Sequence, residues 1–184
     1  MHTIFADHDI PYTGAELRPL WILDTFGAQG DAIAAFIGPC DVTVEHMVDR
    51  LDVLQGATIT AARMLHFIVE QFAEAGLLAA VLSQRLLVCV AADVLREAGV
   101  SLERRGDDLF VGSRKLSVSI ATISAVSSLI HLGLNVDPAG APVPAVGLAE
   151  LGLDARRVGE AVLERYAAEC ASVHAARCKV RAVL

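Results

Sequence analysis

The sequence lacks several features that define common classes of protein. Its first eleven residues have no basic cluster followed by an apolar run, so they do not resemble a secretory signal. The cysteines form no C-x-x-C pair, and their wide spacing favours reduced thiols over a disulfide framework or a zinc site. They are Cys40, Cys89, Cys170 and Cys178. These absences predict a cytoplasmic protein without a bound metal.

Basic residues are also sparse. The chain carries 15 Lys and Arg against 22 Asp and Glu, a formal net charge of −7. Its only basic groupings, Arg104-Arg105 and Arg177–Arg181, are short enough to be solvated surface. A protein that binds duplex nucleic acid usually has a basic stripe, so nucleic acid is not an expected partner. A small anionic ligand stays compatible with this charge.

No stretch has the composition of a membrane span, although 54% of the residues are apolar. Leu116–Val136 is uncharged and long enough, but it contains six Ser or Thr residues and alternates in polarity. Leu77–Leu95 is interrupted by Ser83-Gln84-Arg85. The apolar content therefore indicates a well-filled interior or a subunit interface, and a homodimer is a possible state. At 184 residues the chain fits a single domain, 1–184.

The pattern along the chain predicts an α+β fold. Leu20–Leu23 and Ala32–Ile37 are read as short extended pieces, and Ala57–Phe72 as a longer strand. A helix is expected over Ala75–Ala98, because Leu, Ala and Val dominate there and Gly99 follows as a stop signal. A loop rich in Pro and Gly, at 137–147, separates a helix-and-hairpin core over 75–137 from a helical tail over 148–184, in which helical periodicity covers 155–176.

The clearest local signal is a hairpin around Gly112-Ser113. Two alternating runs flank this two-residue turn, which pairs Val111 with Arg114 and Phe110 with Lys115. Side chains alternate across a strand, so the register sorts them onto two faces. One face is expected to be core: Leu109, Val111, Leu116, Val118 and Ile120. The other is polar: Asp108, Phe110, Lys115, Ser117 and Ser119.

A further alternating strand, Leu129–Val136, extends this arrangement. An antiparallel return would lay His131, Gly133 and Asn135 beside Ser119, Ser117 and Lys115. Such a face could simply meet water. However, small hydroxyls and a glycine around one lysine are more typical of a concave site with donors and room for a ligand.

Four other polar residues are weaker candidates. His66 and Glu70 would stand about 13 Å apart on a strand, too far to share a metal. They are either a core histidine and a paired charge, or groups that face the Lys115 site. His131 is either a general acid or base or a hydrogen-bonded structural residue. Arg105 belongs either to a phosphate-binding turn or to the lead-in of the hairpin.

Two of these segments resemble biotin protein ligases. The run Gly-Asp-Asp-Leu-Phe-Val-Gly-Ser-Arg-Lys-Leu, at 106–116, is similar to their Asn-Asp-Leu-Tyr-Val-x-x-Arg-Lys-Leu segment, and Gly-Leu-Asn-Val, at 133–136, to their Gly-Ile-Asn-Val strand. The whole chain resembles the domain-of-unknown-function 366 family of the same superfamily. The supporting stretches are Tyr12–Gly14, Met64–Glu70, Gln84–Leu86, Arg105–Asp108 and Lys115–Thr122.

The resemblance implies a biotin/lipoate ligase-like fold, with a mixed, mainly antiparallel sheet flanked by helices. It also implies a small-molecule site for carboxylate or acyl activation or transfer. By this resemblance Lys115 would contact an acyl carboxylate and an adenylate phosphate, stabilising developing negative charge, and Asp108 would orient neighbouring groups. The expected ligand-binding residues are Ser117, Ser119, His131, Asn135, His66, Glu70 and Arg105.

The chain departs from the ligase pattern before the strand at 64–72. Ligases carry a loop rich in glycine and arginine there, whereas this chain has Gln55-Gly56-Ala57-Thr58 and then Ala61-Ala62-Arg63. ATP is therefore a cofactor suggested by the resemblance alone, because no phosphate loop is recognisable. The alternative hypothesis is a non-catalytic ligand-binding or homo-oligomeric assembly protein that has lost this loop.

Overall fold

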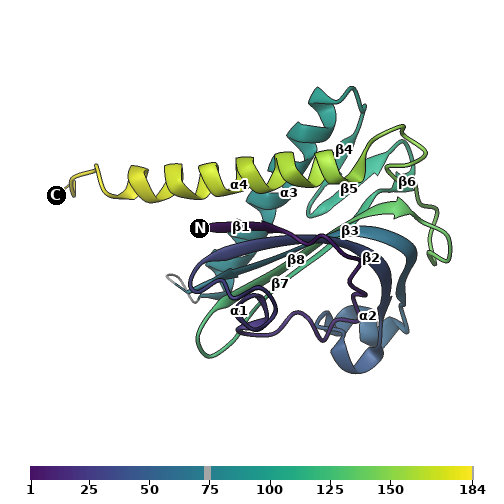
Figure 1. Ribbon diagram of the computed structural model, residues 1–184, viewed down its shortest axis with the longest axis horizontal. Helices are drawn as coiled ribbons and strands as arrows, with labels where there is room; N and C mark the ends of the chain where they lie inside the picture. Colours follow the sequence, from purple (N-terminus) through teal and green to yellow (C-terminus); the bar gives the residue numbers. More distant parts are fainter. Residues whose placement is uncertain (73–75, 184) are drawn as a thin grey trace.

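A five-stranded sheet is the centre of the protein, whose computed structural model describes residues 1–72 and 76–183 (Figure 1). The strand order is β1-β2-β3-β8-β7, with β1 parallel to β2 and the other pairs antiparallel. The strands span His2–Phe5 (β1), Ala32–Val42 (β2), Ile59–Gln71 (β3), Ser117–Ile123 (β7) and Ser128–Asp137 (β8). The predicted mixed, mainly antiparallel α+β fold is confirmed.

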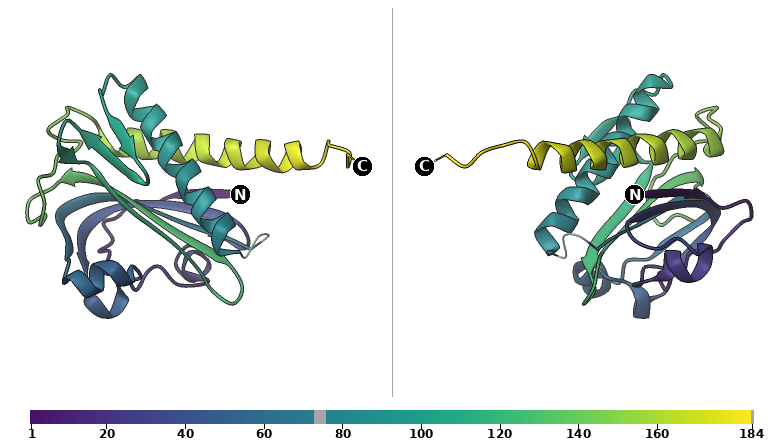
Figure 2. Two further views of the ribbon diagram at one scale, coloured as in Figure 1. Left: turned by 180° about the vertical axis from the view of Figure 1, so that it is seen from behind. Right: turned by 60° about the vertical axis from the view of Figure 1, so that its left-hand side comes forward.

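The remaining elements lie on the two faces and at one end of this sheet (Figures 1 and 2). Three short strands form a second sheet: β4 (Glu103–Arg105), β5 (Asp108–Val111) and β6 (Arg114–Lys115). The helices are α1 (Trp21–Phe26), the 3-10 turn η1 (Val44–His46), α2 (Arg50–Gln55), α3 (Leu77–Glu97) and α4 (Ala155–Arg177).

One face of the main sheet packs against α3 and α4. Alternate residues of the central strands point to this side, and they form a continuous apolar core with the two helices. Its fully buried members include Leu65, Phe67, Ile130 and Leu132 from the strands, and Leu87, Leu95 and Tyr166 from the helices. This core fixes the backbone of β3 and β8, from which the site is built.

Helix α3 is, among the described residues, the one helix long and apolar enough to cross a bilayer. Its buried positions instead pack on the sheet and on α4, and they include Leu87, Val88, Ala91 and Leu95. Its composition is thus that of a core helix. The other uncharged stretch, 116–136, forms the antiparallel pair β7–β8 rather than a helix.

The opposite face of the main sheet is covered by the N-terminal segment and α1. Trp21 and Ile22 of α1 pack with Phe36, Met64 and Ile68 in a second apolar cluster. The buried polar residues His66, Glu70 and His131 lie on this same face, because they alternate with the residues of the first core. The two faces therefore differ in chemistry, and the polar groups are concentrated on this one.

The predicted hairpin is present with the predicted register. Phe110 pairs with Lys115 and Val111 with Arg114 across the Gly112-Ser113 turn. Gly112 has a φ of 61°, a positive value that suits glycine at the first position of such a turn. Arg105 belongs to β4, where it pairs with Asp108 as the lead-in to the hairpin.

The predicted register between β7 and β8 is wrong by one residue. His131 pairs with Ile120 and Gly133 with Val118, rather than with Ser119 and Ser117. The two-face alternation predicted for 108–120 is interrupted at Leu116, where the chain leaves the small sheet and enters the main one. A shift of one residue exchanges the faces. Val118 and Ile120 therefore lie on the His131 face, and Ser119 turns toward α3.

The N-terminal third was only partly predicted. Ala32–Ile37 lies in β2 as expected, but Leu20–Leu23 was wrongly read as extended, because it leads into helix α1. The short helix α2 was also missed. Both helices are six residues long, too short for a clear periodic signal, and they are stabilised by their ends: Gly27 and Gly56 close them with positive φ, and Asp49 caps α2.

Candidate functional site

Lys115 is held at the junction of the two sheets. Its backbone N–H donates to the carbonyl of Pro144 at 2.9 Å, and its carbonyl accepts from the N–H of Val146 at 3.1 Å. The side-chain amide of Asn135 donates to the same carbonyl at 3.2 Å. Two separate segments, the loop at 144–146 and strand β8, thus anchor the backbone of Lys115, from which its side chain extends. Asn135 acts here as a support for Lys115.

The Lys115 ammonium forms an ion pair with Asp108. Nζ lies 2.9 Å from Oδ2, and the two side chains are 31% and 27% exposed. Burial raises the pKa of the Asp108 carboxyl, and the hydrogen bond and charge of Lys115 oppose that rise without cancelling it. A partly desolvated lysine beside a carboxylate offers a charge-assisted donor that a ligand anion can share.

A pocket of about 330 Å³ adjoins this ion pair, and we call it the Lys115 pocket. Its wall contains Lys115, Ser117 and Asn135, but most of it is apolar. The residues that line it are Asp52, Ala57, Thr58, Ile59, Thr60, Met64, Lys115, Ser117, Val118, Asn135, Ala141, Pro142, Val143 and Ala145. An apolar pocket with a few convergent polar groups is the usual form of a small-molecule site.

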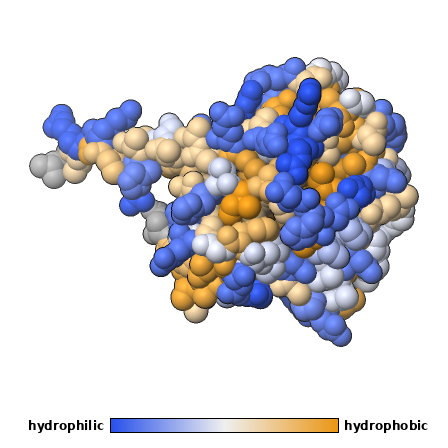
Figure 3. Space-filling view, in the orientation of Figure 1, coloured by the Kyte–Doolittle hydropathy of each residue, from blue (hydrophilic) through white to orange (hydrophobic). Residues whose placement is uncertain are grey.

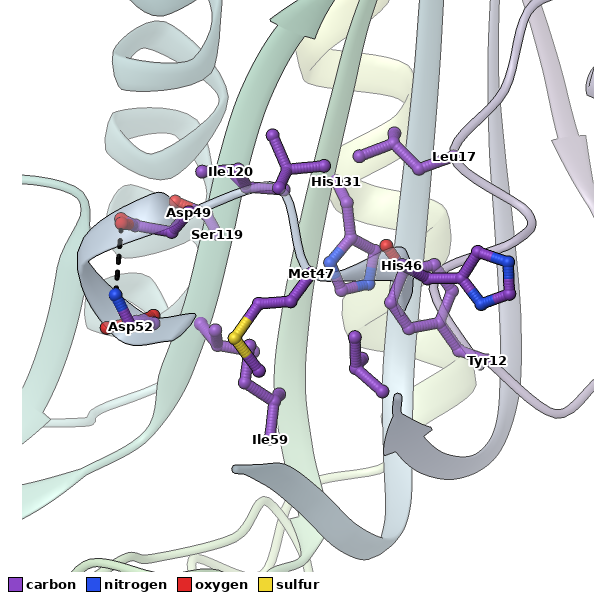
Figure 4. A pocket seen from close by; sticks show the side chains of 13 residues that line it. Tyr12, Leu17, His46, Met47, Asp49, Asp52, Ile59, Ser119, Ile120 and His131 are labelled. Carbon is purple, nitrogen blue, oxygen red and sulfur yellow. Dashed lines mark hydrogen bonds between the residues drawn. The ribbon is translucent and has the colours of Figure 1, made fainter. Parts of the chain in front are cut away.

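A smaller pocket of about 50 Å³ shares part of this lining, and we call it the His131 pocket. The two share Asp52, Ile59 and Val118. Its other lining residues are Tyr12, Leu17, Val42, His46, Met47, Val48, Asp49, Ser119, Ile120 and His131. Figure 4 shows Asp49 and Asp52 on one side of this pocket, with Tyr12 and His46 on the other.

His131 is tied to His66 and Tyr12. Nδ1 of His66 lies 3.1 Å from Nε2 of His131, and the Tyr12 ring stacks on His131 with centroids 3.8 Å apart. Burial lowers the pKa of His66 to about 3, although its hydrogen bond to the Gly38 carbonyl opposes the shift. Burial, followed by the nearby charge of His66, lowers the pKa of His131 well below 6.5. Both rings are therefore neutral near pH 7.

Glu70 is buried on the same sheet face but does not line the Lys115 pocket. Its carboxylate accepts from the N–H of Leu20 at 2.9 and 3.0 Å and from the Ser127 hydroxyl at 2.7 Å. It borders a separate pocket with Leu23 and Phe72. His66 lines none of these three pockets. The alternative in which His66 and Glu70 faced the Lys115 site is therefore contradicted by their positions.

The two serines predicted for the site are both hydrogen-bonded within the protein. The hydroxyl of Ser117 accepts from the N–H of Leu109 at 2.8 Å, and Ser117 lines the Lys115 pocket. The hydroxyl of Ser119 accepts from the Gln84 amide at 2.8 Å, and Ser119 lines the His131 pocket. The structure thus brings them to neighbouring pockets rather than to a single site.

Arg105 lies away from both pockets. Its guanidinium pairs with Glu103 at 2.6 Å, with its carbon 4.8 Å from the centre of the Phe110 ring. Its side chain is 54% exposed. This environment is that of a surface ion pair in the hairpin lead-in.

Sequence analysis did not identify Asp52 or the loop at 137–147 as parts of the Lys115 pocket. Asp52 lies on the unpredicted helix α2, and Val143 lies in the loop at 137–147, which was read only as a connector. That loop forms a bridge with Lys115 at Ala145, and its Pro144 carbonyl accepts the Lys115 N–H. Residues 1–72 and 76–183 contain no cluster of three or more His, Cys, Asp or Glu that could hold a metal ion.

The residues that line the two pockets do not fit a nucleoside triphosphate such as ATP. The resemblance to ligases implies a loop rich in glycine and arginine before the strand at 64–72 of this chain. Here the segment before β3 is helix α2, which contributes the carboxylates Asp49 and Asp52 to the pocket walls. Lys115 is the only Lys or Arg among the lining residues of the two pockets. A triphosphate needs several donors or cations, which the lining of these two pockets does not supply.

The fold is that of the biotin and lipoate protein ligases. Similar solved structures include a biotin protein ligase from Aquifex aeolicus in complex with biotin and ATP, at a TM-score of 0.59 and 15% identity, covering 90% of this chain and 68% of that one. Another is a putative lipoate protein ligase from T. acidophilum with bound lipoic acid, at 0.56 and 12%, covering 88% and 82%. At these identities the likeness concerns the fold.

The chain belongs to the family described as Domain of unknown function (DUF366), which it matches over residues 1–181. An uncharacterized protein of Methanocaldococcus jannaschii is 39% identical over 175 residues, which cover 92% of this chain and 79% of that protein. The structure of a protein of unknown function from Pyrococcus horikoshi is also 39% identical. Its TM-score is 0.96, with coverage of 100% of this chain and 99% of that one.

Proposed function

We propose that this protein binds a small carboxylate-bearing molecule in the Lys115 pocket, within the cytoplasm. The observation that carries the proposal is that Lys115, whose ammonium pairs with Asp108, lines a largely apolar pocket of about 330 Å³. An apolar wall gives affinity for the body of a ligand, and one fixed cation gives orientation to its acid group. A pocket of this volume suits a small metabolite, and neither a membrane nor a nucleic acid is proposed as a partner.

The chemistry that Lys115 can support is that of a carboxyl or acyl group. Its ammonium can donate to a ligand carboxylate while keeping its contact with Asp108, because three N–H bonds are available. The same group can stabilise negative charge that develops on an acyl oxygen during activation or transfer. Asn135 positions the lysine through its backbone, and Ser117 lies on the same wall.

A second candidate function is a non-catalytic binding or assembly protein, which includes a homodimer. It is favoured by Asp49 and Asp52, which lie in the segment before β3 where the resemblance to ligases implies a phosphate loop. It is also favoured by exposed apolar side chains at the turn between β7 and β8, where Ile123 is 42% and Val126 52% exposed. Figure 3 shows an apolar area over this turn, at its lower left. Such areas often mark contacts with partners.

The proposal is tested by thermal shift with biotin, lipoate, octanoate and other small acids, with and without Mg-ATP. A ligand at about 100 times its Kd adds roughly 2.7 kcal/mol, which shifts the midpoint measurably. We expect an acid to stabilise the wild type but not Lys115→Ala. The matched control is Lys179→Ala, which removes the chain's other lysine, an exposed residue near the C-terminus.

One outcome tests the role of Lys115, and two others separate the candidates. Equal stabilisation of wild type and Lys115→Ala by every acid that binds would contradict the role of Lys115. Release of pyrophosphate in the presence of an acid and Mg-ATP would exclude the non-catalytic candidate. A dimer in light scattering, together with no turnover of any acid, would favour it.

A further inference from the structure

Asp52 is one of three residues that line both the Lys115 pocket and the His131 pocket, and it is the only charged one of the three. Among the described residues, no side-chain hydrogen bond or ion pair involves its carboxylate. From its position we propose that the ligand is dipolar, with its carboxylate on Lys115 and an amine on Asp52. This inference rests on the proposed function and names its substrate class.

The neighbouring acid shows why Asp52 differs. Asp49 also lines the His131 pocket, but its carboxylate caps α2, accepting from the N–H of Leu51 at 2.8 Å and of Asp52 at 3.3 Å. Its oxygens therefore have a structural role. Asp52 contributes its backbone N–H to that cap and leaves its own side chain available. A half-buried carboxylate without a partner in a pocket wall favours a cationic donor.

The charges of the pocket walls favour an amine over additional phosphate. Lys115 is already paired with Asp108, so the one lining cation is partly neutralised before a ligand arrives. Asp52 adds negative charge to the lining of both pockets, and Asp49 adds it to the lining of the His131 pocket. A single ligand carboxylate can share Lys115, whereas a polyphosphate would face these carboxylates without further cations. A dipolar ligand matches both walls.

Most of the lining of the Lys115 pocket is apolar. Ile59 and Val118 line both pockets, and Met64 lies beside them in the Lys115 pocket. The segment at 141–145 covers the other side with Ala141, Pro142, Val143 and Ala145. A hydrocarbon body that joins the amine to the carboxylate would bury its surface here. The substrate class is therefore an amino acid with an apolar side chain or an apolar spacer.

The test uses matched pairs of compounds that differ only in the amine. Leucine is compared with 4-methylpentanoate, and 6-aminohexanoate with hexanoate; adipate tests a second carboxylate in place of the amine. Calorimetric titration of the full-length protein gives each affinity. For at least one pair we expect the amino compound to bind the wild type about tenfold more tightly than the plain acid, as a partly desolvated ion pair allows. Adipate is expected to bind more weakly than hexanoate.

The variant Asp52→Asn is expected to bring that ratio to about one while leaving the affinity for the plain acid unchanged or higher. The control is Glu45→Gln, an exposed acid on the preceding turn that lines neither pocket and should keep the wild-type ratio. Melting curves of both variants confirm that they fold.

Each failure is distinct. If plain acids bind with dependence on Lys115 but an added amine brings no gain, the dipolar ligand is refuted and the carboxylate site stands. If Asp52→Asn keeps the preference for the amine, Asp52 is not its partner and the inference is overturned. If neither acids nor amino acids bind, both this inference and the proposed function are overturned.

Discussion

Nδ1 of His66 lies 3.1 Å from Nε2 of His131, inside the sheet face that borders the site. The contact needs one donor and one acceptor. Nε2 of His66 lies 3.4 Å from the carbonyl of Gly38, so that nitrogen carries the proton of the neutral ring. Nδ1 of His66 then accepts, and His131 donates from Nε2. Two neutral rings in these tautomers satisfy both contacts. Protonation of His66 at Nδ1 would remove the acceptor and break the bond between the two rings.

This pair predicts that the protein loses stability as the pH falls below about 6.5, the ordinary pKa of an unfolded histidine. The folded pKa values are depressed, to about 3 for His66 and well below 6.5 for His131. The unfolded chain therefore binds more protons in this window, and the free energy of unfolding decreases toward acid. Each ring contributes at most about 1.4 kcal/mol per pH unit. Urea unfolding at pH 7.5, 6.5 and 5.5 measures the slope.

His131→Gln should reduce this slope by about half, since one of the two depressed histidines is removed. The matched control is His8→Gln, because His8 is exposed and should leave the slope unchanged. A wild-type free energy of unfolding that stays constant between pH 6.5 and 5.5 would contradict the neutral pair.

The backbone conformation of Leu20 leads to a prediction about stability. Leu20 has a φ of 63°, the only positive φ of a non-glycine residue in the described parts of the chain. The left-handed conformation costs a residue with a Cβ about 1–2 kcal/mol, and glycine does not bear this cost. Glu70 holds Leu20 there by accepting its N–H. Because the Leu20 side chain is largely exposed, Leu20→Gly should be neutral or stabilise the protein by up to about 1 kcal/mol.

The control for this effect is Thr25→Gly, an exposed position of the adjacent helix α1. There glycine should destabilise by about 0.3–0.5 kcal/mol, because the backbone conformation is an ordinary helical one and threonine is itself a weak helix former. Chemical unfolding of both variants gives the comparison. Equal losses in the two variants would show that Leu20 is not strained.

The sequence predicted those parts of the fold that depend on short-range chemistry. The Gly112-Ser113 turn sets the register of its own hairpin, so the pairing of Phe110 with Lys115 followed from the residues alone. The β7–β8 register did not, because the Ser124–Ser127 turn is made by serine hydroxyls. Ser124 accepts from the N–H groups of Val126 and Ser127. Several loop lengths suit such a turn, and an error of one residue placed Ser117 and Ser119 on the wrong face.

The site itself was predicted in the same uneven way. Lys115 and Asp108 are neighbours across one hairpin, and their contact was within reach of local reasoning. Asp52 and the segment at 141–145 reach the pocket only through the tertiary fold, because the start of β3 and the end of β8 pair at the same end of the sheet. Nothing in their sequence marks them, since six residues of α2 carry too little periodicity and the loop looks like a connector.

Ser119 gives a prediction that distinguishes a structural serine from a ligand-binding one. The Gln84 side chain, buried in α3, donates to the hydroxyl of Ser119 at 2.8 Å and to Asp107 at 3.0 Å. Ser119 in turn donates to the backbone carbonyl of Asp107 at 3.3 Å. The three groups form a network that joins α3 to the hairpin. Ser119→Ala and Gln84→Ala should each destabilise by about 1–3 kcal/mol, because each leaves a partner unsatisfied.

The double variant should lose less than the sum of the two, with a coupling of about 1 kcal/mol, since both changes remove the same contact. The control cycle combines Gln84→Ala with Ser172→Ala, an exposed serine on α4, and should be additive. Additivity in the Ser119 cycle would mean that the hydrogen bond contributes no stability. If the affinity for an acid ligand also falls in Ser119→Ala, the serine acts on the ligand as well. An unchanged affinity would place its role in the fold alone.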